Sequence, residues 1–305
     1  MEDLKFVITR DEAGARVDKY LADKLGEDYS RTYVKYLMDN GAVHVNAASV
    51  KPHYAIREGD QVECVLLPSP DIDHVIPENI PIEIFYEDDD IIVVNKPAGM
   101  VVHPAAGNKT GTLVNALLYH CKTLPETGDE LRPGIVHRLD KDTSGVIVIA
   151  KSARAHSSLS EQFQNRAVKK SYLAIVKGRV EMDNGIINVP VARHSVDRKK
   201  MAVEFSGGKE AVTVYHVLRR YKNFTLLRLD LLTGRTHQIR VHMKYLGCPV
   251  LGDKKYGTAP GIDRQALHAE KLAFLHPDTG KLMEFTSPLP DDMRGLLEQG
   301  DNAPV

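Results

Sequence analysis

The sequence predicts an α+β protein whose larger part is built on a mixed or antiparallel β-sheet. Several runs of β-branched and aliphatic residues have the length of β-strands, and helical stretches intervene, notably at residues 112–120 and 155–166. The chain has no internal repeat and no low-complexity tract. This pattern fits a doubly wound parallel sheet less well. The clearest strand runs are Ile91–Val94, Gly145–Ala150, Tyr172–Val176 and Phe224–Leu229.

Residues 1–66 are predicted to form a small domain of two helices and short strands. The first helix, Arg16–Leu25, repeats apolar residues at helical spacing, and Ser30 is a suitable N-cap for the second. Asn40 and Gly41 end that second helix, because both residues accept left-handed backbone angles at low cost. The strands predicted in this domain are residues 42–46 and 61–65.

A linker is predicted over residues 67–80, where Pro68, Pro70 and Pro77 stand among scattered Asp and Ser residues. Residues 81–305 then form the larger α+β domain, which contains the strand runs named above.

Composition places the chain among ordinary globular proteins. It has 305 residues, of which 43% are hydrophobic and 27% charged, and its formal net charge is −1. A nucleic-acid partner would therefore have to be met by local clusters of positive charge. Three such clusters occur in the larger domain. They are Arg166–Lys170, Arg193-His194 with Arg198–Lys200, and Arg219-Arg220 with Lys222.

Cellular location is indicated by what the sequence lacks. Cys64, Cys121 and Cys248 lie far apart without CxxC spacing, which argues against a zinc site or a disulfide framework. No apolar run approaches the roughly 20 residues that a membrane span needs, and the N-terminus has no signal-peptide pattern. We therefore expect a cytoplasmic protein without a membrane segment. Since no coiled-coil heptad is present, we also expect a monomer.

The densest group of polar residues is the segment Gly134–Gly145 (GIVHRLDKDTSG), which directly precedes an apolar strand. So many charged and hydroxyl groups cannot be buried cheaply, so the segment must be a surface loop held against the sheet. Taken alone, Asp140 and Asp142 suggest a magnesium-dependent nuclease, and His137-Arg138 a kinase catalytic loop. The other kinase motifs, a Walker loop, an HExxH motif and a dinucleotide fingerprint are all missing.

The run HRLDKDTSG, residues 137–145, resembles the signature loop of the RluA/RluC/RluD group of pseudouridine synthases. The N-terminal domain resembles the small RNA-binding module shared by a ribosomal small-subunit protein and some tRNA synthetases. The likeness extends over essentially the whole chain and is greatest to the RluD branch, whose members modify 23S ribosomal RNA. Further blocks resemble the group's motifs in the same order: Glu87-Asp88, Ile91–Pro97, Val101–Pro104, Lys170–Ala174, Leu232–His242, Asp253, Tyr256-Gly257 and Arg264–Ala269.

The resemblance implies which residues catalyse the isomerisation of uridine. Asp140 would be the catalytic carboxylate, acting either as a nucleophile at the sugar or as a base. Arg235 would pair with Asp140, because a guanidinium binds a carboxylate bidentately and keeps its charge. Tyr172 would stack on the uracil or accept the proton of its carbon 5. No cofactor and no metal are expected, since the reaction is an isomerisation.

The same resemblance implies how RNA is bound. Arg138 would fill the space left by the flipped uridine or hold a flanking phosphate, and His137 would order the loop beside it. In the N-terminal domain, Arg31 and Lys35 lie one helical turn apart, where both can meet phosphates. The expected partner is 23S ribosomal RNA or a pre-ribosomal particle. A tRNA substrate, and a non-catalytic ribosome-assembly factor built on the same fold, remain open alternatives.

Overall fold

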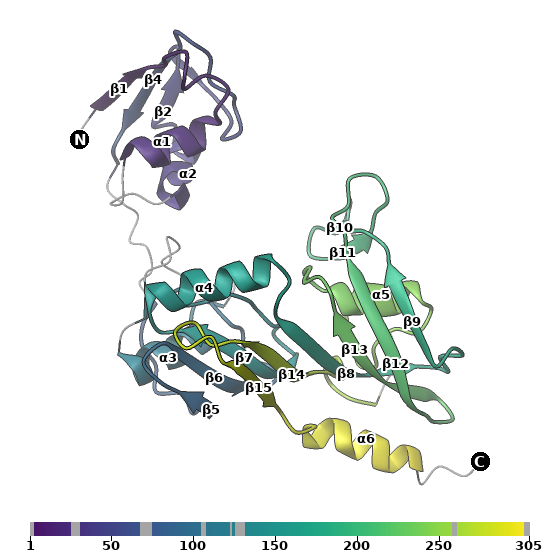
Figure 1. Cartoon of the computed structure of the whole chain (residues 1–305). Coiled ribbons are helices and arrows are strands. Elements are labelled where there is room, and N and C mark those ends of the chain that lie inside the picture. The colour runs from purple at the N-terminus through teal and green to yellow at the C-terminus, as the bar shows by residue number, and fades with distance from the viewer. Residues whose placement is uncertain are drawn as a thin grey trace. The chain divides into compact units, whose positions relative to one another are not determined.

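The computed structural model of the chain describes residues 3–25, 31–67, 75–104, 108–122, 124–125, 132–257 and 261–301 (Figure 1). Side chains of residues 31, 32 and 301 are outside this description. The described residues divide into two compact units, one ending at residue 67 and the other starting at residue 75. The predicted linker spans this division, and its residues 68–74, like the predicted N-cap Ser30, lie outside the described residues.

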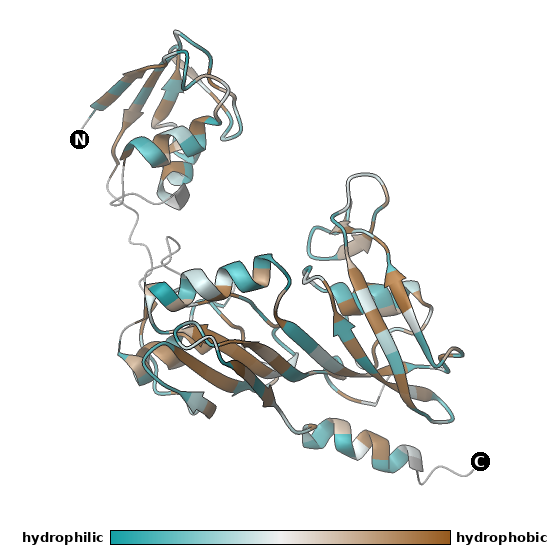
Figure 2. Cartoon of the chain, in the orientation of Figure 1, coloured by the Kyte–Doolittle hydropathy of each residue, from teal (hydrophilic) through white to brown (hydrophobic). Residues whose placement is uncertain are grey.

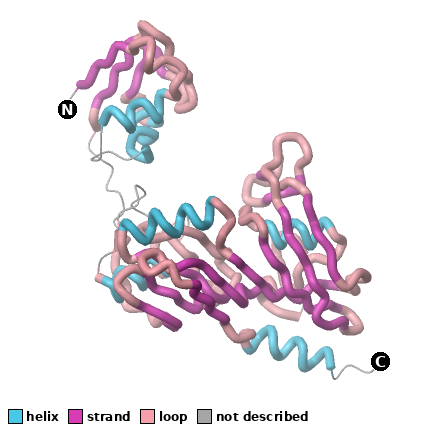
Figure 3. The backbone as a smooth tube through the Cα atoms, viewed as in Figure 1, coloured by secondary structure: helices cyan, strands magenta, loops and turns pink. Residues whose placement is uncertain are grey.

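The N-terminal unit packs two helices against a small antiparallel sheet (Figure 3). The strand order is β1-β4-β2-β3. Its core contains Val17 and Leu21 from the first helix and Val34 and Leu37 from the second, all fully buried. The burial of Val17 and Leu21 matches the helical spacing of apolar residues predicted for the first helix. The elements are β1 (Asp3–Val7), α1 (Val17–Leu25), α2 (Arg31–Asp39), β2 (Val43–Val45), β3 (Ala48–Ser49) and β4 (Gln61–Val65).

The larger unit is built on a nine-stranded sheet of order β5-β6-β7-β14-β8-β13-β12-β9, with β15 paired to β14. The pair β7–β14 is parallel, and the other pairs are antiparallel. The strands are β5 (Glu83–Glu87), β6 (Ile91–Lys96), β7 (Ser144–Ala150), β8 (Lys169–Lys177), β9 (Asn184–Asn188), β12 (Val212–Arg220), β13 (Phe224–Leu231), β14 (Leu267–Leu275) and β15 (Leu282–Thr286). The predicted α+β class with a mixed sheet is therefore confirmed.

Helices and a hairpin complete this unit. They are α3 (Leu113–Cys121), α4 (Ala153–Gln164), the hairpin β10 (Val191–Arg193) and β11 (Met201–Val203), α5 (Gln238–Tyr245) and α6 (Asp291–Asp301). Strand β7 is buried on both faces: Val146 and Val148 pack in the core that includes α4, whereas Ile147 and Ile149 pack in the core that includes α3. Figure 2 accordingly shows hydrophobic colour concentrated on the sheet. Among the described residues, no helix combines the length and the apolar character that crossing a membrane requires.

The sheet register places the start of β7 close to the middle of β8. Ala269 on β14 pairs with Gly145 on one side and with Tyr172 on the other, so these three residues form one row across the sheet. Ser144, the first residue of β7, pairs with His268, and His268 pairs with Leu173, so the loop before β7 leaves the sheet next to the row that contains Tyr172. The predicted polar loop and the predicted tyrosine are brought together in this way.

Candidate active site

The polar segment 134–145 forms a loop whose end is pressed against the sheet. Gly145 has a φ of +117°, and a Cβ atom at this position would lie 2.2 Å from the carbonyl oxygen of Ala269. Only glycine permits this approach. Earlier in the loop, the carbonyl of Asp140 accepts a hydrogen bond from the Thr143 N–H at 3.1 Å. The loop thus presents Asp140 with 17% of its side chain exposed.

The Asp140 carboxylate is paired with Arg240, which lies in the first turn of α5. Arg240 Nη1 donates to Asp140 Oδ2 at 2.8 Å. The rest of the guanidinium is held by Asp253, which accepts from Nε at 2.6 Å and from Nη2 at 2.9 Å. Burial alone would raise the pKa of Asp253, but hydrogen bonds and charge from Arg240 outweigh it and the pKa is lowered. The Arg240 guanidinium is therefore held by Asp253 through Nε and Nη2, and its Nη1 donates to Asp140.

Two adjoining cavities, of about 60 and 330 Å³, are both lined by this ion pair. Tyr172 lines the smaller one, and Lys254 and Lys255 line the larger one. The larger cavity therefore carries positive charge next to the paired carboxylate. The residues common to both cavities are Arg138, Leu139, Asp140, His237 and Arg240.

Tyr172 presents a buried aromatic ring to the smaller cavity, with 9% of the residue exposed. Burial, together with the negative charge of Asp140, raises the pKa of its hydroxyl above the ordinary value. The phenol is therefore neutral over the working range of pH. A neutral ring beside a carboxylate is suited to stacking on a planar base.

A fully buried lysine, Lys96, joins the loop to neighbouring backbone through hydrogen bonds. Lys96 Nζ donates to the carbonyls of Pro97 and Met100 at 2.8 Å and of Lys141 at 3.1 Å. Burial lowers the pKa of this amine to about 7, against the opposing charges of Asp140 and Asp142. The residue after Asp140 is thus tied to the end of β6.

The predicted pairing of Arg235 with Asp140 is wrong. Arg235 lies before α5 begins, where its Nε donates to the carbonyl of Glu210 at 2.9 Å, although the side chain lines the smaller cavity. Arg240, in the first turn of the helix, faces Asp140 instead. Both arginines stand in the block 232–242, so the sequence contained the signal, but not the direction of either side chain.

His137, which is predicted to order the loop beside Arg138, lines neither of the two cavities. Its ring stacks on Phe163 with centroids 4.4 Å apart, and its Nε2 accepts the Val148 N–H at 3.1 Å. Burial lowers its pKa to about 3, so the ring stays neutral and orders the loop. Arg138 points the other way: it is exposed, lines both cavities and makes no hydrogen bond or ion pair with any described residue.

The predicted RNA-contacting residues of the N-terminal unit lie on α2. Lys35 is exposed on this helix, while the side chain of Arg31 is outside the described part of the chain. Their role stays a prediction.

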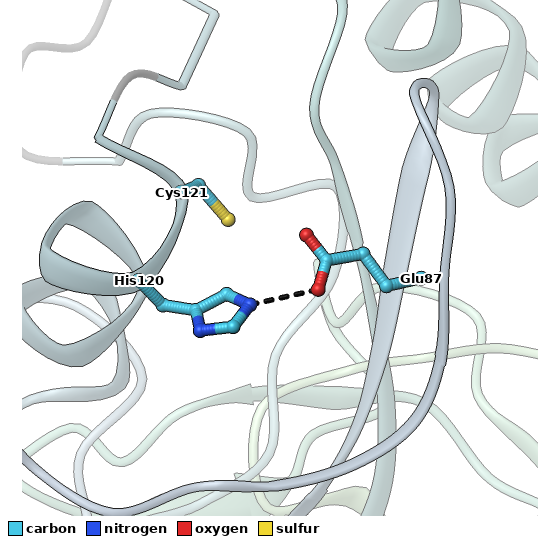
Figure 4. Close-up of side chains that lie close together, drawn as sticks. All are labelled: Glu87, His120 and Cys121. Carbon is cyan, nitrogen blue, oxygen red and sulfur yellow. Dashed lines mark hydrogen bonds and ion pairs between the residues drawn. The ribbon is translucent and has the colours of Figure 1, made fainter.

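One group of potential metal ligands occurs in the described residues, away from the cavities. Glu87 on β5 and His120 and Cys121 at the end of α3 point toward one another (Figure 4). Glu87 already pairs with His120 Nε2 and with Lys151 Nζ, each at 2.7 Å. Both carboxylate oxygens are therefore engaged, and Glu87 links β5 to the end of α3 and to Lys151, which directly follows β7.

Comparison with known proteins identifies the family. The family described as RNA pseudouridylate synthase matches residues 90–245, and the S4 domain family matches residues 15–62. The chain therefore belongs to the RNA pseudouridylate synthase family, and it is a pseudouridine synthase with an N-terminal S4 domain.

Individual relatives agree with this assignment. An uncharacterized RNA pseudouridine synthase, YlyB of Bacillus subtilis, is 49% identical over 98% of both chains. Ribosomal large subunit pseudouridine synthase D of Pasteurella multocida is 45% identical over 94% of this chain and 91% of its own. Among solved structures, human RNA pseudouridylate synthase domain containing 4 superposes with a TM-score of 0.58 and 26% identity, covering 72% of this chain and 93% of that chain.

Proposed function

We propose that this protein converts uridines of 23S ribosomal RNA to pseudouridine, with Asp140 as its catalytic residue. The observation that carries the proposal is the Asp140 carboxylate, which Arg240 orients and which lines two adjoining cavities, one of them also lined by Tyr172. Oδ2 is taken by Arg240, whereas Oδ1 accepts no hydrogen bond from any described residue. One oxygen is therefore held and the other is available to the substrate.

The reaction breaks the bond between ribose carbon 1′ and uracil nitrogen 1, turns the base, and joins carbon 1′ to carbon 5. The proton on carbon 5 is then lost, and nitrogen 1 takes up a proton. Asp140 Oδ1 is suited to attack carbon 1′ or to remove a ribose proton, and both routes need the ionised carboxylate. The Arg240 guanidinium pairs with the Asp140 carboxylate and keeps it in one orientation.

Tyr172 contacts the flipped base, and Arg138 acts on the RNA from which the base has been flipped. The buried ring of Tyr172 stacks on the uracil during its rotation, and its neutral hydroxyl makes it a poor acceptor for the carbon 5 proton. Arg138 is exposed and unpaired among the described residues, so it is suited to occupy the space that the flipped uridine leaves.

RNA binding is supported by exposed cations around the site. Of the three basic clusters, the hairpin β10–β11 presents Arg193, Arg198 and Lys199 to solvent. Arg166 and Arg220, from the other two clusters, are paired with Glu210 and Asp183. The hairpin, with the lysines of the larger cavity, is thus the main candidate for phosphate contacts.

The choice of 23S ribosomal RNA rests on similarity to relatives named ribosomal large subunit pseudouridine synthase D. We propose that the chain acts as a monomer and without a cofactor. The test is to incubate the protein with unmodified 23S ribosomal RNA and, separately, with unmodified tRNA, and to map pseudouridine by carbodiimide-dependent reverse-transcription stops. Stops in 23S ribosomal RNA support the proposal. Stops confined to tRNA would show that tRNA, and not 23S ribosomal RNA, is the substrate of the same reaction.

A further inference from the structure

His237 lies in the candidate active site but has no role in the proposed reaction. It lines both cavities, and its Nε2 lies 3.8 Å from Asp140 Oδ2. As the residue directly before α5, it has a left-handed backbone with φ 56° and ψ 18°, and its side chain does not cap the helix. A left-handed histidine is uncommon, and such strain is concentrated at functional sites.

The protonation of His237 can be worked out from its neighbours. The Tyr256 hydroxyl accepts the Met201 N–H at 2.7 Å and lies 2.8 Å from His237 Nδ1. Tyr256 is buried, so its own hydroxyl proton needs an acceptor, and Nδ1 provides it. The proton of the neutral imidazole then resides on Nε2, which faces the Asp140 carboxylate. Burial, which lowers the pKa of His237 to about 4, agrees with a neutral ring.

The far end of this chain of hydrogen bonds lies in the basic hairpin. Met201 is the first residue of β11, and residues 194–200 form the hairpin loop that precedes it. A second bond joins the same elements, because Lys255 Nζ donates to the carbonyl of Lys199 at 3.4 Å. Both Lys255 and Tyr256 belong to the turn that starts at Asp253, and Asp253 holds Arg240.

We infer that His237 is a positioning residue, held as the Nε2–H tautomer by Tyr256, and that it couples the placement of hairpin β10–β11 to the Asp140 carboxylate. This inference rests on the proposed function, in which the hairpin contacts RNA. When RNA holds the hairpin, Met201 fixes Tyr256, Tyr256 fixes His237, and the Nε2–H group restrains Asp140 together with Arg240. Formation of pseudouridine is thereby favoured when RNA is bound to the hairpin.

The tautomer is tested first, without substrate. Nitrogen-15 NMR of the imidazole rings, with the His237 signals assigned by their loss in His237→Gln, distinguishes the two neutral forms. We expect the Nε2–H form in the wild type, and a loss of that preference in Tyr256→Phe, which keeps the ring over Arg240 but removes the hydroxyl. An Nδ1–H form in the wild type would overturn the inference.

The coupling is tested by single-turnover rates at saturating 23S ribosomal RNA. Tyr256→Phe is expected to lower the rate about 10-fold, equivalent to about 1.4 kcal/mol, and to leave the dissociation constant for RNA within about twofold. Tyr215→Phe is the matched control, because this buried tyrosine on β12 makes no hydrogen bond to any described residue through its hydroxyl. It is expected to react at the wild-type rate.

The same rates are measured with the hairpin variant Arg198→Gln/Lys199→Gln. If the hairpin is coupled to Asp140 through Tyr256 and His237, the single-turnover rate of this variant is low even at saturating RNA. Adding Tyr256→Phe then lowers that rate by less than about threefold. A saturated hairpin variant with the wild-type rate, or an undiminished effect of Tyr256→Phe in that background, would overturn the coupling. A wild type that forms no pseudouridine would instead refute the proposed function, and the NMR result would still stand.

Discussion

Replacing Arg240 by glutamine removes the guanidinium that pairs with both Asp140 and Asp253. The side chains of Arg240 and Asp253 are 5% and 0% exposed, so the Asp253 carboxylate cannot be rehydrated without opening the turn that contains it. Two backbone N–H groups, of Lys255 and Tyr256, still donate to Asp253, but two charge-assisted bonds are lost. Breaking one partner of a buried pair costs about 3–5 kcal/mol. We expect the free energy of unfolding to fall by about that amount.

Activity should also fall, because Asp140 loses the partner that orients its carboxylate. We expect a decrease of at least about 1000-fold in the single-turnover rate, measured at a temperature where the variant is folded by circular dichroism. Asp253→Asn combined with Arg240→Gln removes the unpaired buried charge. This double variant should recover part of the stability in urea denaturation, and none of the activity.

Arg235→Gln is the matched control, since Arg235 bonds through its side chain to a backbone carbonyl and is partly exposed. Its cost should stay below about 1.5 kcal/mol. A larger loss of rate in Arg235→Gln than in Arg240→Gln would refute the assignment of the ion pair to Arg240.

The remaining predictions concern the residues around the loop. Lys96→Met leaves three carbonyls without their donor, so unfolding in urea should become easier by about 2–4 kcal/mol, and retention of full stability would contradict the role given to this lysine. Burial lowers the pKa of His137 from its ordinary 6.5 to about 3. The unfolded chain therefore takes up a proton that the folded chain does not, and the wild type should lose up to about 3 kcal/mol between pH 6.5 and 4, whereas His137→Gln should show a shallower pH profile. His237→Asn places a residue that tolerates left-handed angles at this position, so its melting temperature should equal or exceed that of the wild type while its rate falls; an unchanged rate would remove His237 from the site.

The order of elements around the site was predictable because its strands are apolar and bounded by polar segments. The runs at 91–94 and 145–150 became β6 and β7, and the polar loop before 145 became the site. The edge hairpin β10–β11 was not predicted, since its strands are short and partly exposed.

Side-chain direction is what the sequence could not supply. Arg235 and Arg240 are five positions apart, and the start of α5 lies between them. Arg235 therefore contacts the carbonyl of Glu210, whereas Arg240 contacts Asp140. Lys96 stands in a predicted strand motif, and nothing in the sequence indicates its burial, because a lysine is rarely found at zero exposure. Its three carbonyl acceptors come from segments that meet only in the folded chain.

The catalytic role of Asp140 is tested most directly with 23S ribosomal RNA labelled with tritium at carbon 5 of uracil. Release of tritium is measured for the wild type and for Asp140→Asn, in the presence of a metal chelator, and the length of the RNA is checked afterwards. We expect release by the wild type alone, with the RNA intact. Equal release by Asp140→Asn would contradict the role of Asp140, and cleaved RNA that disappears on chelation would indicate a metal-dependent nuclease instead.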